Sequence, residues 1–217
     1  MSAAPLLVVC ALAPEVWALR GGDWTGAAVT PVLARTGMGP ARARERAGAL
    51  LATGGYGGLA VAGFGAAVGP GCRPGDVIVA DRVQGQGAFH ALGSAEALAA
   101  QLRGRGLTVH IGPHHTADHV VRGLERRALH AQGALAVDME AAAVLAAAAE
   151  LRPELPVAVL RVVVDTPERE LLRPGTLPAG LQAWRALRAA VPALTAWHRF
   201  AAPATETLPS TLPQEAS

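Results

Sequence analysis

Cysteine is scarce in this chain, and its scarcity excludes several classes of protein. Only Cys10 and Cys72 occur among the 217 residues, with no CxxC pair and no group of histidine and cysteine at the spacing of a zinc site. A disulfide framework is therefore excluded, and we predict no metal-ligating residues. Two isolated cysteines are typical of a reducing, cytoplasmic compartment.

An excess of charge of one sign is also lacking. The chain has 19 basic and 17 acidic residues, a net charge of +2, and its arginines are dispersed along the sequence. Proteins that bind nucleic acid usually carry a clustered basic surface. We therefore expect no nucleic-acid partner.

Uncharged apolar runs of membrane-spanning length are absent as well. A transmembrane helix needs about 20 apolar residues, but Asp138 and Glu140, and then Glu150, interrupt the longest candidate. The N-terminal "SAAPLLVVCALAP" imitates a signal peptide without a basic n-region, and we interpret it as a buried first strand. We expect a cytoplasmic protein that is soluble or contacts a membrane only peripherally.

Apolar residues, in contrast, are abundant, at 51% of the chain against 17% charged. Short apolar runs alternate with alanine-rich segments of helical character, which is typical of an α/β domain with a buried central sheet. We predict one domain over residues 1–200 and a disordered tail over 201–217, which has little to bury. Strands are expected at 5–12, 27–36, 58–64, 76–83, 107–112, 133–139 and 156–164, and helices at 40–53, 94–104, 116–131, 140–151 and 177–199.

Glycine-rich turns follow several of these strands, at 36–39 ("TGMG"), 63–71 ("GFGAAVGPG") and 74–76 ("PGD"). Such glycines either permit tight turns or let backbone N–H groups approach an anion or a ribose hydroxyl. The "GFG" fragment lacks the third glycine of a dinucleotide fingerprint, which excludes a nicotinamide cofactor site of that kind.

Three carboxylates follow predicted strands, at Glu15, Glu140 and Asp165. Taken singly, Glu140 could be an acid favoured by a helix dipole, and Asp165 could be a turn residue. In α/β sheets, however, ligands bind beyond the carboxyl ends of strands. Three acids at such ends in one apolar domain indicate a functional cleft, because buried carboxylates need a reason to be there.

The segments "ALAPEV", "TGMG", "RPGDVIVAD", "VDMEAAAV" and "LRVVVDTP" resemble the nucleoside phosphorylase and nucleosidase superfamily over residues 6–165. The resemblance implies a single-domain, three-layer α/β/α fold with a central mixed β-sheet. It also implies cleavage of an N-glycosidic bond to a purine, without a cofactor, in an enzyme that assembles as a homo-oligomer.

The resemblance assigns roles to particular residues. Asp165 would protonate purine N7, with a pKa raised by burial, and Glu15 would activate the attacking water. Glu140 would hold the ribose hydroxyls, with Met139 packed on the sugar or base. Asp138 would be a supporting or a solvated residue. Further substrate-binding residues are Phe64, Gly65, Gly37 and Gly39.

Several positions depart from the family pattern. Val164 stands where a serine or threonine usually orients the catalytic aspartate, and Phe64 replaces a small polar residue. No arginine occurs in residues 54–72, where phosphorylases bring one to phosphate, so water is favoured over phosphate. His114, His115 and His119 are expected near the base pocket, either as loop residues without acidic partners or with a direct role.

The segment after Arg161, "RVVVDTPERELLRPGTLPAGL", looks most like the hopanoid-associated branch, which is implicated in removing adenine from adenosylhopane. This implies a lipid-linked adenosyl substrate and an apolar mouth, with the helix at 177–199 as a lid. Aromatic residues that could line the mouth, or could be ordinary core, are Trp17, Trp24, Trp184, Trp197 and Phe200.

Other functions remain open on the sequence. The enzyme alternatives are a methylthioadenosine/S-adenosylhomocysteine nucleosidase and a phosphorylase that uses phosphate as co-substrate. Futalosine hydrolase is disfavoured because that branch lacks an acid where Asp165 stands. The non-enzyme alternative is a catalytically silent module that binds a nucleoside or lipid.

Overall fold

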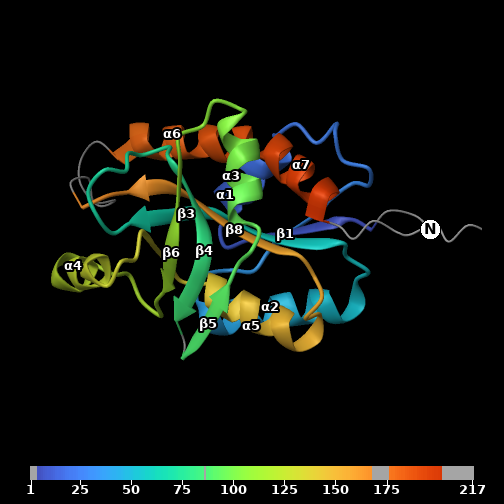
Figure 1. Ribbon diagram of the computed structural model, residues 1–217, viewed down its shortest axis with the longest axis horizontal. Coiled ribbons are helices and arrows are strands. Elements are labelled where there is room, and N and C mark those ends of the chain that lie inside the picture. The colour runs from blue at the N-terminus through green and yellow to red at the C-terminus, as the bar shows by residue number, and fades with distance from the viewer. Residues whose placement is uncertain (1–3, 86, 168–175, 202–217) are drawn as a thin grey trace, which may run out of the picture.

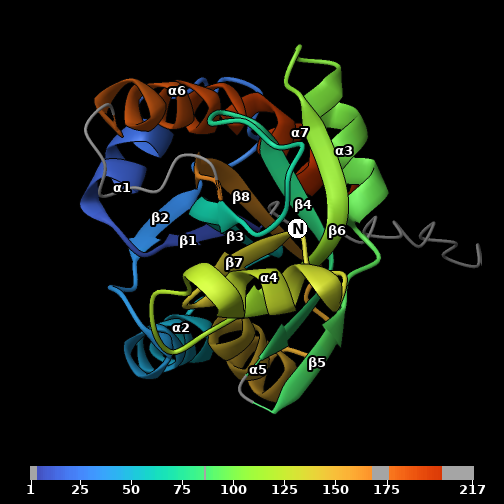
Figure 2. The ribbon, with the colours of Figure 1, turned by 90° about the vertical axis from the view of Figure 1, so that its left-hand side faces the viewer.

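The computed structural model describes residues 4–85, 87–167 and 176–201, and its centre is a sheet of eight strands with helices on both faces (Figures 1 and 2). The strands are β1 (Leu6–Cys10), β2 (Val32–Arg35), β3 (Gly58–Ala67), β4 (Val77–Gly85), β5 (Ala88–Ala91), β6 (Val109–Thr116), β7 (Ala136–Asp138) and β8 (Val157–Asp165). The helices are α1 (Ala13–Arg20), α2 (Pro40–Thr53), α3 (Ala95–Arg103), α4 (Gly123–Ala131), α5 (Ala141–Leu151), α6 (Thr176–Ala189) and α7 (Val191–Ala201).

The sheet is mixed, with the order β2-β1-β3-β7-β6-β4-β5 and with β8 paired to both β3 and β4. β1, β2, β3 and β8 run parallel, so their carboxyl ends meet at one edge. β7 runs antiparallel to β3, with Ala66 opposite Val137, and therefore turns its own end back toward the middle of β3. This arrangement brings the residues that follow β1 and β7 beside β3 and β8.

Each face of the sheet is covered by its own set of helices (Figure 1). Leu6 and Val8 of β1 pack with α1, α3, α6 and α7, whereas Leu7 and Val9 pack with α2 and α5. The alternation follows from the two-residue period of a strand. The predicted three-layer fold with a central mixed sheet is confirmed.

Some predicted boundaries were wrong. The strand expected over 27–36 is limited to Val32–Arg35, since Pro31 has no N–H to donate to a ladder. The helix expected over 116–131 begins only at Gly123, because β6 continues to Thr116 through its pairing with β7. The helix expected over 177–199 is two helices, because the ring of Pro192 prevents α6 from continuing into α7.

Two elements were not predicted. β5 forms a short hairpin with β4, and α1 begins directly after β1 with Pro14 in its first turn. Glu15, expected only as a residue after a strand, therefore lies in the first turn of a helix, where its orientation is fixed.

Among the described residues, no helix is both long and apolar enough to cross a bilayer. Of the tail expected over 201–217, only Ala201 is described, as the last residue of α7. Part of the proline-containing segment that resembles the hopanoid-associated branch, residues 168–175, also lies outside the described residues.

Candidate active site

A cleft of about 380 Å³, called the carboxylate cleft below, opens where β1, β3, β7 and β8 end. Its lining includes the predicted residues Glu15, Phe64, Gly65, Met139, Glu140 and Asp165. The tertiary structure thus brings together six of the eight residues that the sequence indicated. Gly37 and Gly39 are the exceptions, since Met38 between them lines the cleft instead.

Glu15 is held rigidly at the base of this cleft. Its side chain is buried, with 2% of the residue exposed, and it accepts the N–H groups of Leu12 and Phe64, each at 2.6 Å. A Cβ on Gly63 would clash with Oε1 of Glu15, so only glycine permits this approach. Burial raises the pKa of Glu15, although Arg161 and the two N–H groups oppose the shift.

Arg161 of β8 is the buried cation beneath the cleft. Its guanidinium lies 2.7 Å from Oδ2 of Asp138 and 3.9 Å from Oε2 of Glu140, and its side chain is 1% exposed. A Cβ on Gly65 would lie 2.8 Å from the Cβ of Arg161, which explains the glycine beside this strand.

Asp138 is buried rather than solvated. It accepts the Thr116 hydroxyl at 2.7 Å and the Nε–H of Arg161 at 2.8 Å. Burial alone would raise its pKa, but Arg161 and the Thr116 hydroxyl lower it below the ordinary value. Asp138 therefore stays ionised and fixes the guanidinium.

Glu140 stands at the N-terminus of α5 and connects that helix to the loop after β2. Its Oε1 accepts the N–H of Gly39 at 3.1 Å, and Gly39 has a φ of +91°, which favours glycine. Burial raises the pKa of Glu140, with Arg161 opposing the shift. The predicted Gly39 therefore positions Glu140 from outside the cleft lining.

Asp165 ends β8 and is positioned by an arginine that the sequence did not indicate. Nη1 of Arg126, on α4, lies 3.3 Å from Oδ1 of Asp165, and Nη2 donates to the Asp165 carbonyl at 3.2 Å. Nε of Arg126 donates to the carbonyl of Ala67 at 2.9 Å, which anchors the guanidinium to β3. Figure 2 shows α4 lying across this end of the sheet. The Asp165 side chain is largely buried, with 16% of it exposed.

The three histidines have different surroundings. His114 is fully buried in β6, where burial lowers its pKa to about 4, and neither it nor His115 lines the cleft. His119 does line the cleft, with its ring nitrogens 2.6 Å from Asp118 and 2.9 Å from Glu125. These hydrogen bonds raise the pKa of His119, contrary to the expectation that it had no acidic partners.

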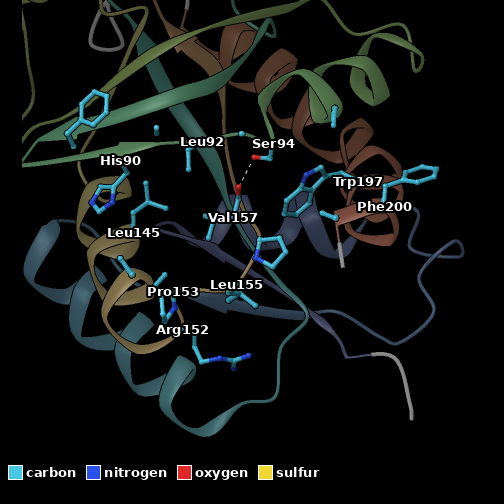
Figure 3. A pocket seen from close by; sticks show the side chains of 18 residues that line it. His90, Leu92, Ser94, Leu145, Arg152, Pro153, Leu155, Val157, Trp197 and Phe200 are labelled. Atoms are coloured by element: carbon cyan, nitrogen blue, oxygen red, sulfur yellow. Dashed lines mark hydrogen bonds between the residues drawn. The ribbon is translucent and has the colours of Figure 1, made fainter. Parts of the chain in front are cut away.

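The aromatic residues expected at the mouth lie elsewhere. Trp197 is core, at 1% exposed, and the exposed Phe200 borders a different cavity of about 710 Å³ (Figure 3). In that cavity Ser94 donates to the carbonyl of Val157, and no carboxylate is among the described residues that line it. Leu12, Met38, Phe64, Val120, Val121 and Val164 form the apolar part of the carboxylate cleft instead.

Sequence reasoning missed the contacts of two buried arginines, Arg126 and Arg161, with the candidate acids. Arg161 was noted only as part of a motif, although a lone cation in the apolar strand "VAVLRVVV" predicts a buried ion pair. Arg126 shares the buried face of α4 with Leu129, three residues on, so helical spacing could have indicated that it points inward.

Comparison with known proteins agrees with this architecture. A family model described as the Phosphorylase superfamily matches residues 13–176. No curated protein matched the chain. The chain belongs to the Phosphorylase superfamily, and the prediction that it is an enzyme is confirmed at the level of that family.

Solved structures share the fold at low sequence identity. The chain is similar to the 5′-methylthioadenosine/S-adenosylhomocysteine nucleosidase of Neisseria meningitidis in complex with methylthio-immucillin-A, at 21% identity and a TM-score of 0.72, over 89% of this chain and 98% of that one. The Streptococcus pneumoniae nucleosidase with a transition-state inhibitor gives 23% identity and a TM-score of 0.68, over 88% and 99%. The Helicobacter pylori nucleosidase gives 14% and 0.73, over 91% and 98%.

Proposed function

We propose that this protein is a purine nucleosidase that hydrolyses the N-glycosidic bond of an adenosyl substrate. The observation that carries the proposal is the charge of the cleft. Three carboxylates, on Glu15, Asp138 and Glu140, surround the guanidinium of Arg161. An excess of negative charge beside the sugar site stabilises the cationic, oxocarbenium-like transition state of glycosidic cleavage.

Glu15 and Asp165 have separate roles in the proposed reaction. Glu15 accepts a proton from water as the water oxygen bonds to C1′ of the ribose, and its raised pKa suits a general base near neutral pH. The C1′–N9 bond breaks, and its electron pair leaves with the base. Asp165 supplies a proton to N7, and Arg126 at 3.3 Å stabilises the carboxylate that this transfer leaves.

Glu140 accepts hydrogen bonds from the ribose hydroxyls in this proposal. It lines the cleft one residue after Met139, and the N–H of Gly39 fixes its Oε1 at 3.1 Å. No step in the scheme requires a cofactor. The substrate that we infer is an adenosyl compound, and neither Arg126 nor Arg161 lines the cleft.

Water is favoured over phosphate as the nucleophile. Arg161 is engaged by Asp138 and is 1% exposed, so it is sealed from the cleft. A phosphate dianion near Glu15 and Glu140 would meet repulsion from both, whereas water would not. Arg122 lines the cleft on an exposed segment and, with His119, is a cation that a phosphorylase reaction could use.

For the group at the ribose 5′ position we infer a lipid-linked substituent, as in adenosylhopane. The support is the apolar rim of the cleft, where Met38 is 54% and Val120 55% exposed. Exposed apolar side chains beside a polar site are typical of a surface that receives an apolar ligand. A rim of this kind would also accept a smaller apolar group, so methylthioadenosine or S-adenosylhomocysteine is the second candidate.

The test is mass-spectrometric product analysis of the purified protein with adenosylhopane and, separately, with methylthioadenosine, each with and without phosphate. Free adenine and ribosylhopane without phosphate are the expected products. Release that requires phosphate and yields a ribosyl phosphate would contradict hydrolysis. Efficient turnover of methylthioadenosine but not of adenosylhopane would select the second candidate.

Matched variants separate catalysis from simple binding. Glu140→Gln and Asp165→Asn should lose turnover, whereas Glu150→Gln, at an exposed pair with Arg44, should keep it. Nucleoside binding without turnover in the wild type would identify a silent binding module instead.

A further inference from the structure

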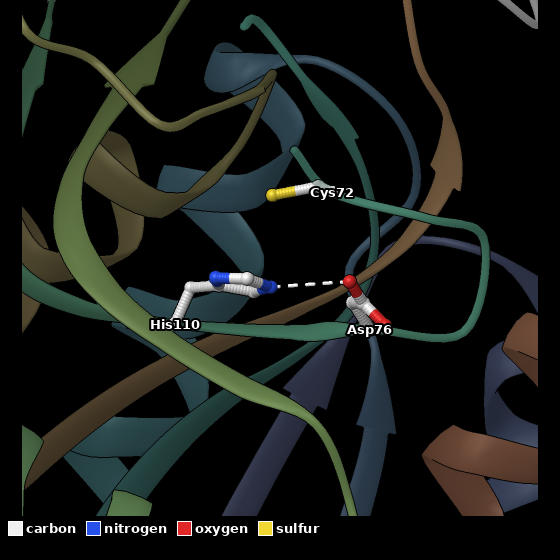
Figure 4. A group of neighbouring side chains, drawn as sticks. All are labelled: Cys72, Asp76 and His110. Carbon is white, nitrogen blue, oxygen red and sulfur yellow. Dashed lines mark hydrogen bonds and ion pairs between the residues drawn. The ribbon is translucent and has the colours of Figure 1, made fainter. Parts of the chain in front are cut away.

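Cys72 and Asp76 lie together with His110, which is distant from them in the sequence, at the end of β8 that carries Asp165 (Figure 4). Cys72 lies in the segment between β3 and β4, Asp76 directly precedes β4, and His110 belongs to β6. Because β4 and β6 are parallel, with Ile78 opposite His110, the histidine lies beside the start of β4. The cluster is therefore built by the sheet and one connecting segment.

The three groups have the separations of ligands around one ion. Nε2 of His110 lies 3.1 Å from Oδ2 of Asp76, and one ligand atom from each of the three residues lies within 4.8 Å of the other two. Ligands at the bond lengths of tetrahedral zinc, about 2.0–2.3 Å, stand roughly 3.3–3.6 Å apart. Small side-chain rotations would thus bring all three onto a common ion.

The three side chains of the cluster are partly exposed to solvent, and a backbone hydrogen bond orients one of them. All three residues are half-buried, with 32% of the His110 side chain and 13% of the Asp76 side chain exposed. The N–H of Arg73 donates to Oδ2 of Asp76 at 3.0 Å and orients that carboxylate. Partial exposure leaves an entry path for an ion, and solvent water would supply the fourth ligand.

We propose that Cys72, Asp76 and His110 bind a divalent zinc ion. Thiolate, imidazole and carboxylate are the three ligand types that zinc takes in proteins, and a thiolate discriminates against magnesium and calcium. The site is separate from the proposed hydrolysis, since none of the three residues lines the carboxylate cleft.

The backbone links this site to the end of β8. The N–H of Gly75 donates to the Val163 carbonyl, and the N–H of Val163 donates to the Asp76 carbonyl, both at 2.8 Å. Val163 precedes Asp165 by two residues. A bound ion would therefore fasten the segment before β4 to β6 and stiffen the strand end that carries Asp165, so zinc should raise the midpoint of thermal unfolding.

The test is zinc binding to the full-length chain after treatment with a chelator, measured by titration calorimetry. Cobalt(II) serves as a second probe, because a thiolate ligand gives it a charge-transfer absorption band. One ion per chain is expected, with affinity at least about tenfold weaker in Cys72→Ser and in His110→Gln, and with the cobalt band absent in Cys72→Ser.

The chain offers matched controls for both ligands. Cys10→Ser removes the only other cysteine, whose burial raises its pKa to about 12, and should keep the cobalt band. His115→Gln alters a neighbouring histidine of β6 and should keep zinc affinity. Metal-free circular dichroism verifies that each variant is folded. The absence of saturable zinc binding, or a cobalt band that survives Cys72→Ser, would overturn the site, whatever the outcome of the nucleosidase assays.

Discussion

The guanidinium of Arg126 lies against Asp165, with Nη1 3.3 Å from the carboxylate Oδ1 and Nη2 3.2 Å from the Asp165 carbonyl. The preceding residue, Val164, has no hydroxyl with which to orient the carboxylate. A residue on α4 therefore supplies the orientation that the strand itself does not. Arg126 is a positioning residue for the proposed proton transfer to N7.

Replacing Arg126 with methionine should lower kcat at least about tenfold while changing KM little, because a misplaced acid weakens the transition state more than the bound substrate. Arg126→Lys should recover part of the loss, since an ammonium keeps the charge but not the two-point contact. Steady-state kinetics on the adenosyl substrate measure both. Arg127→Met, an exposed neighbour on the same helix, is the control. An equal loss of kcat in Arg127→Met would show that the effect comes from a disturbance of α4 and not from the contact of Arg126 with Asp165.

Replacing Glu15 with glutamine should lower kcat by about 10²–10⁴, the usual contribution of a general base. The amide keeps the shape of the side chain but cannot take a proton from water. In the wild type kcat should rise with pH through the raised pKa of Glu15, and that limb should vanish in the variant. Glu154→Gln, at an exposed pair with Arg152, should leave the pH–rate profile intact. A limb that persists in Glu15→Gln would give the role of base to another group.

The same substitution should change how the free energy of unfolding depends on pH. Burial raises the folded-state pKa of Glu15 above its ordinary value of 4.5, so the folded state binds this proton more tightly than the unfolded chain does. The contribution that the protonated Glu15 makes to the free energy of unfolding is fully present below pH 4.5, and it is lost as the pH rises through the raised pKa. Glutamine offers only one oxygen to the N–H groups of Leu12 and Phe64, so Glu15→Gln should be the less stable protein in acid. Urea unfolding at several pH values should show this deficit shrinking toward neutrality. A stability difference that is independent of pH would contradict this linkage.

Removing the cation of Arg161 should be strongly destabilising. Arg161→Met leaves Asp138 and Glu140 buried without their guanidinium, and breaking a buried ion pair in this way typically costs about 3–5 kcal/mol. Adding Asp138→Asn should recover part of the loss, because it removes one of the uncompensated charges. Arg44→Met, at the exposed pair with Glu150, should cost about 0–1 kcal/mol in the same urea titrations. Equal costs for the two arginines would show that the buried cluster stabilises the fold no more than a surface ion pair does.

The apolar rim gives a test of the substrate class. Met38→Glu places a charge where Met38 is 54% exposed, and it should raise KM for adenosylhopane by about tenfold through lost apolar burial. KM for methylthioadenosine should change less, since its 5′ group covers less of the rim. Parallel assays with the two substrates measure the difference. Leu124→Glu, at an exposed residue outside the cleft lining, is the control. Equal effects on both substrates would argue against a lipid-linked substituent.

Much of the candidate site could be predicted from the sequence, because its elements are local. Glu15, Glu140 and Asp165 each follow an apolar run, and a buried strand ends where polar residues begin. Helix α2 was predicted over its observed residues, since Gly39 and Pro40 mark its start. These features depend on neighbours within a few residues, which the sequence displays directly.

The tertiary structure alone decided which distant residues meet. Arg126 contacts Asp165 across 39 positions, Arg161 contacts Asp138 across 23, and His110 contacts Asp76 across 34. Each contact depends on which strands and helices the fold brings side by side, and no local pattern encodes this. The sequence indicated the three candidate acids, because periodicity and turns are short-range. The partners and charges around those residues were decided by packing, because electrostatic interactions act through space rather than along the chain.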